Sequence, residues 1–218
     1  MDITDILDSE LKFDNASVVI VGPGADLDDP TVFYYLNRNN AGKTYIVDKE
    51  DSFYPTNGFG NLTRFKGLLA SFLEETNLQL SRNITFLNSN STDLDKNLPE
   101  NPDIISYRGV IQHMYDGDIK STIESAFKIL KPSGKIVIMT RKYLDSYNLL
   151  KEMLSANNLK EYDISDKEFF RIKADNAPVV PKFWSMFNDG ELPIHSLYDN
   201  TVAFEPRFLT DRLLIAEK

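Results

Sequence analysis

Short, mostly apolar runs recur along the first two thirds of the chain and are rich in β-branched residues. They occupy residues 17–21, 43–47, 84–87, 103–107 and 135–139. A continuous apolar run, without polar alternation, is typical of a strand that is buried on both faces, as in a parallel sheet. We therefore expect five parallel strands, of which the first ends at Gly22 and the second at Asp48.

Segments with helical spacing separate these runs. One set of apolar residues comprises Leu62, Phe65, Leu69, Phe72 and Leu73, and another comprises Ile119, Ile123, Phe127 and Leu130. Side chains three and four positions apart share one face of a helix, so each set predicts an amphipathic helix. We also expect a helix that begins with Asp29 as N-cap and Pro30 as first residue, and another near residues 144–154. Strands that alternate with helices predict a parallel sheet covered on both faces.

The last third of the chain lacks the regular hydrophobic periodicity of helices or strands. Residues 159–206 carry aromatic residues and prolines in irregular order, whereas residues 212–216 have the pattern of a strand. We interpret this part as two more strands separated by an irregular insertion at about residues 160–207. The insertion is either a lid over a substrate pocket or a small hydrophobic cluster under a long loop. No second domain is indicated, so residues 1–218 are interpreted as one domain.

Composition and charge narrow the range of partners. The chain has no cysteine, which excludes disulfides, thiolate metal sites and cysteine nucleophiles. Its formal net charge of -9 repels polyanions on average, so a nucleic-acid partner is disfavoured. No apolar stretch is long enough to span a bilayer, and residues 1–15 resemble neither a signal peptide nor a transit peptide. We therefore expect a cytoplasmic protein without a membrane partner; no feature indicates an oligomeric state.

A glycine-rich turn follows the first predicted strand. Gly22, Pro23 and Gly24 let the backbone turn sharply and come close to a ligand, although a plain tight turn has the same pattern. Asp26, Asp28 and Asp29 then crowd the entrance to the next helix. Carboxylates at that position would repel the pyrophosphate of a dinucleotide and would suit a cationic ligand. The alternative is that these aspartates only cap the helix and are solvated.

Asp48 lies at the end of the second predicted strand. A carboxylate at this place can accept two hydrogen bonds from the diol of a ribose. Both NAD and S-adenosylmethionine contain such a ribose, so Asp48 favours nucleoside binding without distinguishing the two cofactors. The alternative is a surface acid at the end of a strand.

Two further segments carry a family resemblance. Residues 129–138, ILKPSGKIVI, contain a leucine-lysine-proline turn before the fifth strand, and residues 102–114, PDIISYRGVIQHM, cover the fourth strand and the following loop. With the glycine turn and Asp48 in this order, residues 16–142 and the final strand resemble the class I S-adenosylmethionine-dependent methyltransferases. The resemblance implies an α/β fold of the Rossmann-like, doubly wound kind. Its sheet would be mostly parallel and seven-stranded, with helices on both faces and an antiparallel last strand.

The resemblance also implies S-adenosylmethionine as cofactor and assigns residues to its methionine end. Gly22, Pro23 and Gly24 would line the methionine part. Arg108 and Gly109, at the carboxyl end of the fourth strand, would lie beside it. That end of an open parallel sheet is where ligands bind.

For the nucleoside end, the resemblance implies that Asp48 holds the ribose hydroxyls. Asn90, with Ser91 beside it, falls where the family commonly has an aspartate that faces the adenine amino group. An amide oxygen can accept the same hydrogen bond.

Two positions depart from the family pattern. Ile20 stands where the family usually has an acid, and Asp26 replaces the third glycine of the turn. A cationic ligand in a partly desolvated turn needs a counter-charge. We therefore expect Asp26 or Asp28 to supply the missing carboxylate to the methionine ammonium group.

His113 is the candidate catalytic residue, because it follows the fourth strand, close to the expected methyl group. Its unperturbed pKa near 6.5 suits a general base. The alternative is a histidine that packs at a helix start and titrates in solvent. The sequence contains no pair of histidines at metal-ligand spacing, so we assign no metal ligands; a metal bound by scattered carboxylates is the alternative.

These observations lead to one function and two alternatives. We expect S-adenosylmethionine-dependent methyl transfer to a small-molecule acceptor with an oxygen or nitrogen nucleophile. The departures at Ile20 and Asp26 keep open a non-catalytic, cofactor-binding or regulatory domain. An NAD-dependent oxidoreductase is the third possibility, which the acidic helix entrance disfavours.

Overall fold

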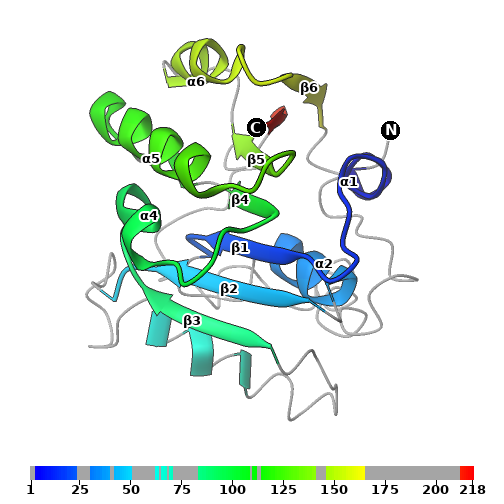
Figure 1. Cartoon of the computed structure of the whole chain (residues 1–218), viewed down its shortest axis with the longest axis vertical. Helices are drawn as coiled ribbons and strands as arrows, with labels where there is room; N and C mark the ends of the chain where they lie inside the picture. Colours follow the sequence, from blue (N-terminus) through cyan, green and yellow to red (C-terminus); the bar gives the residue numbers. More distant parts are fainter. Residues whose placement is uncertain are drawn as a thin grey trace, which may run out of the picture.

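The computed structural model describes eleven segments of the chain. They are residues 3–23, 30–39, 42–50, 62–63, 65–67, 69–70, 83–108, 110–111, 114–140, 146–164 and 212–218. The elements in these segments form one sheet with helices beside it (Figure 1). In chain order they are α1 (Ile3–Glu10), β1 (Ser17–Val21), α2 (Pro30–Arg38), β2 (Lys43–Asp48), β3 (Ile84–Asn88), the 3-10 turn η1 (Ser91–Asp93), α4 (Leu94–Asn97), β4 (Ile104–Arg108), α5 (Asp116–Ile129), β5 (Lys135–Thr140), α6 (Ser146–Leu154), β6 (Lys160–Asp163) and β7 (Arg212–Glu217).

The sheet has seven strands in the order β3-β2-β1-β4-β5-β7-β6. The first five strands pair in parallel. β7 lies between β5 and β6 and runs antiparallel to both. The expected fold class, with its mostly parallel sheet and antiparallel last strand, is confirmed.

Burial of both sheet faces explains the continuous apolar runs. All five residues of β1 are buried, and alternate side chains point to opposite faces. Val18 and Ile20 belong to a core cluster that also contains buried residues of α1, α2 and residues 62–69. Val19 and Val21 belong to a second cluster with buried residues of α4, α5 and α6. The helices therefore cover the sheet in two layers, one on each face (Figure 1).

The strands begin and end within one residue of the positions that the sequence predicts. Asp103, expected as the first residue of the fourth strand, instead lies just before β4. Its carboxylate accepts a hydrogen bond from the backbone N of Ser17 at 2.8 Å and pairs with Lys131 at 2.7 Å. Asp103 thus joins the beginnings of β1 and β4 and the turn before β5.

The helix α1 was not expected from the sequence. Its apolar residues Ile3, Ile6 and Leu7 are buried in the first core cluster. Asp8 accepts a hydrogen bond from Tyr34 at 2.8 Å and forms an ion pair with Arg38 at 2.7 Å, so polar contacts also join α1 to α2. The burial of this short segment comes from tertiary packing, which the periodicity of about two helical turns does not reveal.

Glu10, at the end of α1, joins this helix to β5 and to the edge strand β6. Its carboxylate accepts hydrogen bonds from Lys160 at 2.8 Å and from Tyr162 at 2.7 Å, and it lies 3.4 Å from the Lys135 ammonium. Burial raises the pKa of this carboxyl, but the hydrogen bonds and charges of these three residues outweigh burial and hold the pKa below its ordinary value.

A carboxyl whose pKa is lower in the folded state stabilises the fold above its unfolded pKa. That contribution is lost as the pH falls through the folded pKa. We therefore expect Glu10→Gln to lower the free energy of unfolding at pH 7 and to lessen its decline below about pH 4.5, measured by urea unfolding. Glu124→Gln, at an exposed position of α5, is the control. Parallel pH curves for the parent and Glu10→Gln would contradict this account.

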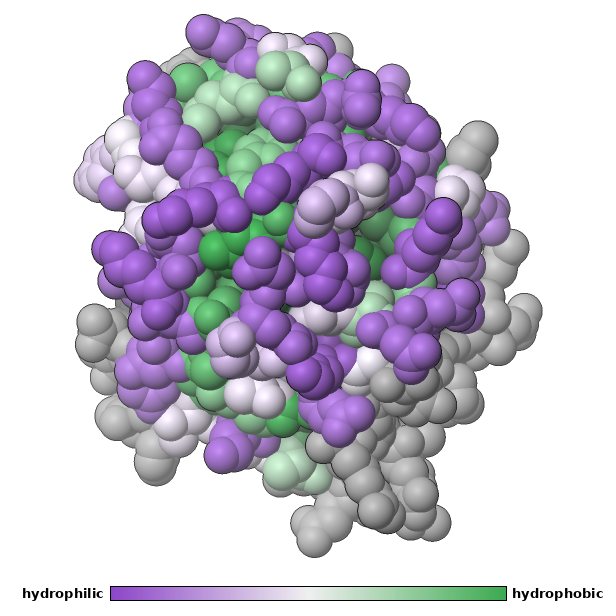
Figure 2. Space-filling model, in the orientation of Figure 1, coloured by the Kyte–Doolittle hydropathy of each residue, from purple (hydrophilic) through white to green (hydrophobic). Residues whose placement is uncertain are grey.

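The described surface keeps its apolar residues inward. On the face shown in Figure 2, hydrophilic residues separate smaller apolar areas. Tyr115, with 85% of its surface exposed, is the single large hydrophobic residue classed as exposed within the described segments. None of the described helices is both long and apolar enough to cross a membrane.

The two strands expected in the last third are β6 and β7. Residues 160–163 form β6, so the irregular insertion, expected from about residue 160, begins after this strand. Residues 165–211 lie outside the described part of the chain. The substrate lid and the single domain over residues 1–218 therefore stay predictions.

Candidate functional site

The strand order reverses at β1, which creates the site where open α/β sheets bind ligands. From β1 the chain adds β2 and then β3 on one side, and it returns to place β4 on the other side. Val21 is paired with Val47 of β2 and with Tyr107 of β4. The carboxyl ends of β2, β1 and β4 therefore lie side by side, and a crevice at this switch point is the default ligand site.

Gly22 follows β1 and has a backbone that favours glycine. Its φ is 65°, and its N donates a hydrogen bond to the carbonyl oxygen of Val47 at 2.8 Å. A Cβ at this residue would lie 2.3 Å from the Cγ2 of Val110, just beyond β4. The expected sharp turn begins here, with Pro23 buried beside it. The other residues assigned to the turn, Gly24 and Asp26, lie outside the described segments, as do Asp28 and Asp29.

Asp48 ends β2 on the same edge of the sheet and is partly exposed. Its Oδ1 accepts a hydrogen bond from the backbone N of Lys49 at 2.7 Å. Its carbonyl oxygen accepts one from the N of Ser89 at 3.1 Å. The carboxylate is thus held by the local backbone at the end of the strand, next to the segment that follows β3.

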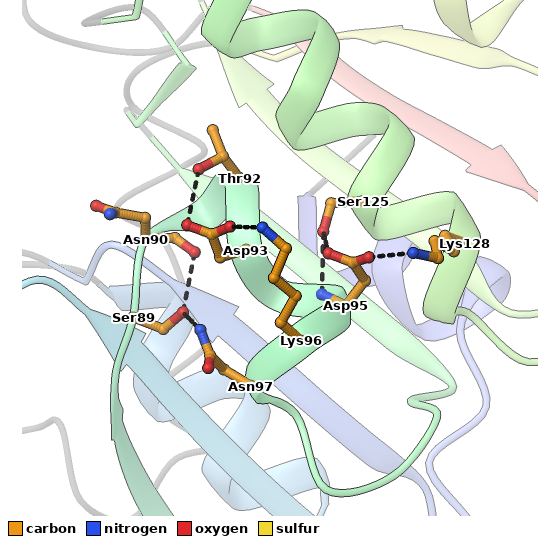
Figure 3. Close-up of polar contacts among 9 residues, drawn as sticks. All are labelled: Ser89, Asn90, Thr92, Asp93, Asp95, Lys96, Asn97, Ser125 and Lys128. Carbon is orange, nitrogen blue, oxygen red and sulfur yellow. Dashed lines mark hydrogen bonds and ion pairs between the residues drawn. The ribbon is translucent and has the colours of Figure 1, made fainter.

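Asn90 and Ser91 lie directly beyond β3. Asn90 is the N-cap residue of η1, but its side chain makes no capping hydrogen bond and is exposed. Figure 3 shows this amide pointing away from α4. Ser91 instead turns towards α5, where its Oγ lies 3.1 Å from the Oγ1 of Thr122. Of these two neighbours, Asn90 therefore presents its side chain outward, and Ser91 uses its hydroxyl within the protein.

A polar cavity of about 250 Å³ opens beside these residues. It is lined by Lys49, Glu50, Asn88, Ser89, Asn90, Asp93 and Asn97. The sequence singled out only Asn90 from this set. The others flank Asp48 and Asn90 in the chain, at the ends of two adjacent parallel strands, and that position was the available signal. Asn97 carries no such signal, because its place depends on how α4 folds back.

Arg108 is the last residue of β4 and is half-buried. It therefore lies on the same edge as Gly22 and Asp48, one strand away from Gly22. Gly109 and His113 lie outside the described segments, so their expected roles stay predictions. Among the described residues, no group of acidic or histidine side chains is arranged to hold a metal ion.

Tyr107, near the carboxyl end of β4, lies in the core. It is fully buried in the cluster beneath α5, and burial raises the pKa of its hydroxyl above the ordinary value. Its hydroxyl has no hydrogen-bond partner among the described residues. The side chain is therefore neutral and packs against apolar neighbours.

Comparison with known proteins identifies the fold at this point. No protein-family model matches the chain, and no curated protein matches it. Among solved structures, magnesium protoporphyrin IX methyltransferase from Synechocystis, with bound S-adenosylmethionine, is 12% identical, with 99% of this chain and 76% of the other covered and a TM-score of 0.55. An rRNA methylase from Clostridium thermocellum is 10% identical over 99% and 93% of the two chains, with a TM-score of 0.54. The N-methyltransferase NodS from Bradyrhizobium japonicum, in complex with S-adenosylhomocysteine, is 11% identical over 93% and 78%, with a TM-score of 0.53.

At these identities the shared property is the fold. The chain has the Rossmann-like fold of the class I S-adenosylmethionine-dependent methyltransferases, as its sequence resemblance implied. These neighbours are named for acceptors as different as a porphyrin and ribosomal RNA, so the fold alone assigns no acceptor.

Proposed function

We propose that this protein is an S-adenosylmethionine-dependent methyltransferase that acts on a small molecule through an oxygen or nitrogen nucleophile. One observation carries the proposal: the fold brings Gly22, Asp48 and Asn90 to the carboxyl ends of three neighbouring parallel strands, β1, β2 and β3. The polar cavity beside Asn90 supports it, since a nucleoside offers several hydrogen-bonding groups.

The residues present fit the nucleoside half of the cofactor. Asp48 would accept hydrogen bonds from the two ribose hydroxyls, and Asn90 would accept one from the adenine amino group. Asp48 ends β2, and Asn90, which lines the cavity, follows the adjacent strand β3. S-adenosylmethionine supplies a methyl group already activated by its sulfonium sulfur.

The methionine half would lie across the switch point. The turn at Gly22 and Pro23 would line it from β1, and Arg108 would lie beside it from β4. Ile20 is 2% exposed and packs in the core on the α1 and α2 side. Ile20 thus offers no charge, and the proposal assigns the counter-charge for the ammonium group to Asp26 or Asp28.

The protein's part in the chemistry is to align the acceptor and to take up a proton. With the cofactor bound, the residues of the site would hold the acceptor's lone pair in line with the methyl carbon, so that the methyl group would pass to the acceptor and S-adenosylhomocysteine would be left. Alignment in one line accounts for much of the rate, because the reactants are held together in the correct geometry. His113 is proposed to receive the proton that the acceptor loses.

The net charge of -9 favours a small acceptor over a nucleic acid. A polyanion would have to overcome repulsion by the whole molecule before it reached the crevice. A non-catalytic cofactor-binding domain is the second candidate, favoured by the apolar burial of Ile20 where the family usually has an acid.

Ligand binding tests the proposal directly. We expect S-adenosylhomocysteine to raise the melting temperature and to give a saturable signal in calorimetry, because a ligand that binds the folded state stabilises it by mass action. NAD should do neither. Tight NAD binding without any response to S-adenosylhomocysteine would contradict the cofactor assignment. Cofactor binding without methyl transfer to any acceptor in a broad panel of small phenols and amines would favour the non-catalytic candidate.

A further inference from the structure

Hydrogen bonds between side chains and the backbone tie the segment after β3 to α4 (Figure 3). The Nδ2 of Asn97 donates a hydrogen bond to the Oγ of Ser89 at 2.8 Å. Ser89 in turn donates its one hydroxyl hydrogen to the carbonyl oxygen of Asn90 at 3.0 Å. The donor-to-acceptor order of these two hydrogen bonds is fixed, because an amide nitrogen only donates and a carbonyl oxygen only accepts. Asn97 therefore acts on the backbone of Asn90 through Ser89.

The helix α4, which carries Asn97, is itself attached to α5, the longest described helix. Asp95 of α4 accepts a hydrogen bond from the Oγ of Ser125 at 3.0 Å and forms an ion pair with Lys128, both on α5. The backbone N of Asp95 donates to the same Ser125 hydroxyl at 3.0 Å. Leu94 is fully buried beneath these contacts. Because α4 is fixed to α5 in this way, Asn97 is a firm point of attachment.

Contacts on both sides then hold the backbone of Asn90. Its carbonyl oxygen also accepts a hydrogen bond from the N of Asp93 at 3.0 Å. Ser89, which is 7% exposed, donates its backbone N to the carbonyl oxygen of Asp48. The same serine thus links Asp48, which ends β2, to Asn90, the N-cap residue of η1. The Asn90 side chain takes no part in these bonds and points outward.

We propose that Asn97 and Ser89 are positioning residues, which form a polar brace that sets the Asn90 amide at the distance and angle needed to bind the adenine amino group. The inference rests on the proposed function, since it assigns a nucleoside to this site. Without the brace, the Asn90 backbone keeps one of its two hydrogen bonds, and its amide samples more orientations. A hydrogen bond weakens steeply as its geometry departs from linearity, so base recognition suffers first.

Two ligands separate base recognition from general damage. S-adenosylhomocysteine carries the 6-amino group that Asn90 would bind, and its 6-desamino (purine riboside) analogue lacks that group. We expect Asn97→Ala to weaken S-adenosylhomocysteine binding about fivefold, as for the loss of one neutral hydrogen bond. Binding of the 6-desamino analogue should change by less than about twofold in calorimetry. A general loosening of the fold would weaken both ligands equally.

Further variants test whether the brace acts as one chain. Asn97→Asp should behave like Asn97→Ala, because a carboxylate draws the Ser89 hydrogen away from Asn90. Ser89→Ala should show the same ligand selectivity, and the double variant should lose no more than Ser89→Ala alone, since the two residues act through one path. Asn148→Ala, at an exposed position of α6, is the matched control and should bind both ligands like the parent.

The results distinguish this inference from the proposed function. If the parent binds S-adenosylhomocysteine and Asn97→Ala binds it equally well, or loses both ligands to the same extent, the brace is wrong and the cofactor assignment stands. Additive losses in the double variant would also overturn the brace. If the parent binds neither ligand, the proposed function itself fails and the brace falls with it.

Discussion

Asp48→Ala should remove most of the affinity for S-adenosylmethionine and S-adenosylhomocysteine. The carboxylate stands at the carboxyl end of β2, beside the switch point, with one oxygen already held by the backbone N of Lys49. Its proposed partners are the two ribose hydroxyls, and hydrogen bonds to a charged acceptor are the strong ones. We expect a loss of about 2–4 kcal/mol of binding free energy, measured by calorimetry.

The stability of the fold should change little in this variant, because Asp48 is partly exposed and lies at the end of its strand. Glu124→Ala removes the same charge from an exposed position of α5 and is the control for a change in net charge alone. Asp48→Asn should retain part of the affinity, because an amide oxygen still accepts one hydrogen bond. An Asp48→Ala variant that binds cofactor as tightly as the parent would show that Asp48 is a surface acid.

Gly22→Ala should destabilise the protein and weaken cofactor binding together. With φ at 65°, an alanine occupies a backbone region that costs L-residues about 1–2 kcal/mol. Its methyl group would also lie 2.3 Å from the Cγ2 of Val110, so either the Val110 side chain or the turn at Gly22 must shift. We expect the free energy of unfolding to fall by about 2 kcal/mol in urea titration, with a loss of cofactor affinity because one wall of the crevice moves.

Gly117 offers a matched control for this substitution. It lies in the first turn of α5, and an added Cβ there meets nothing within 4 Å. Gly117→Ala should therefore leave stability unchanged or raise it by up to about 1 kcal/mol, since alanine favours a helix. Equal effects of the two alanine substitutions would argue against strain at Gly22.

The hydrophobic pattern was sufficient to predict the strands, because a strand that is buried on both faces is apolar along most of its length. Each side chain of β1 is buried, so the run is apolar at nearly every position. The short helix α1 has no hydrophobic pattern long enough to be recognised in the sequence. Three apolar residues and Leu11 fill its buried side, while its ties to α2 and β6 depend on Asp8 and Glu10, whose partners are distant in the chain.

The site was predictable to the extent that it follows from strand ends. Asp48 and Asn90 end up on one edge because parallel strands all end there. Asn97 was not predictable, since its contact with Ser89 depends on α4 docking onto α5 through Asp95 and Ser125. Side chains that act through a neighbour's backbone carry no motif of their own in a single sequence.

The position of β7 between β5 and β6 determines the order in which the sheet can be completed during synthesis. β5 pairs on one side with β4, which precedes it in the chain, and on its other edge with residues 212–217, which are synthesised much later. At about 5–20 residues per second, ribosomes leave that edge open for several seconds after β5 has emerged. An open edge with buried-type residues such as Ile136 and Ile138 is a template for pairing with other chains. The nascent protein is therefore most exposed to aggregation, and most in need of chaperone protection, until the last strand inserts.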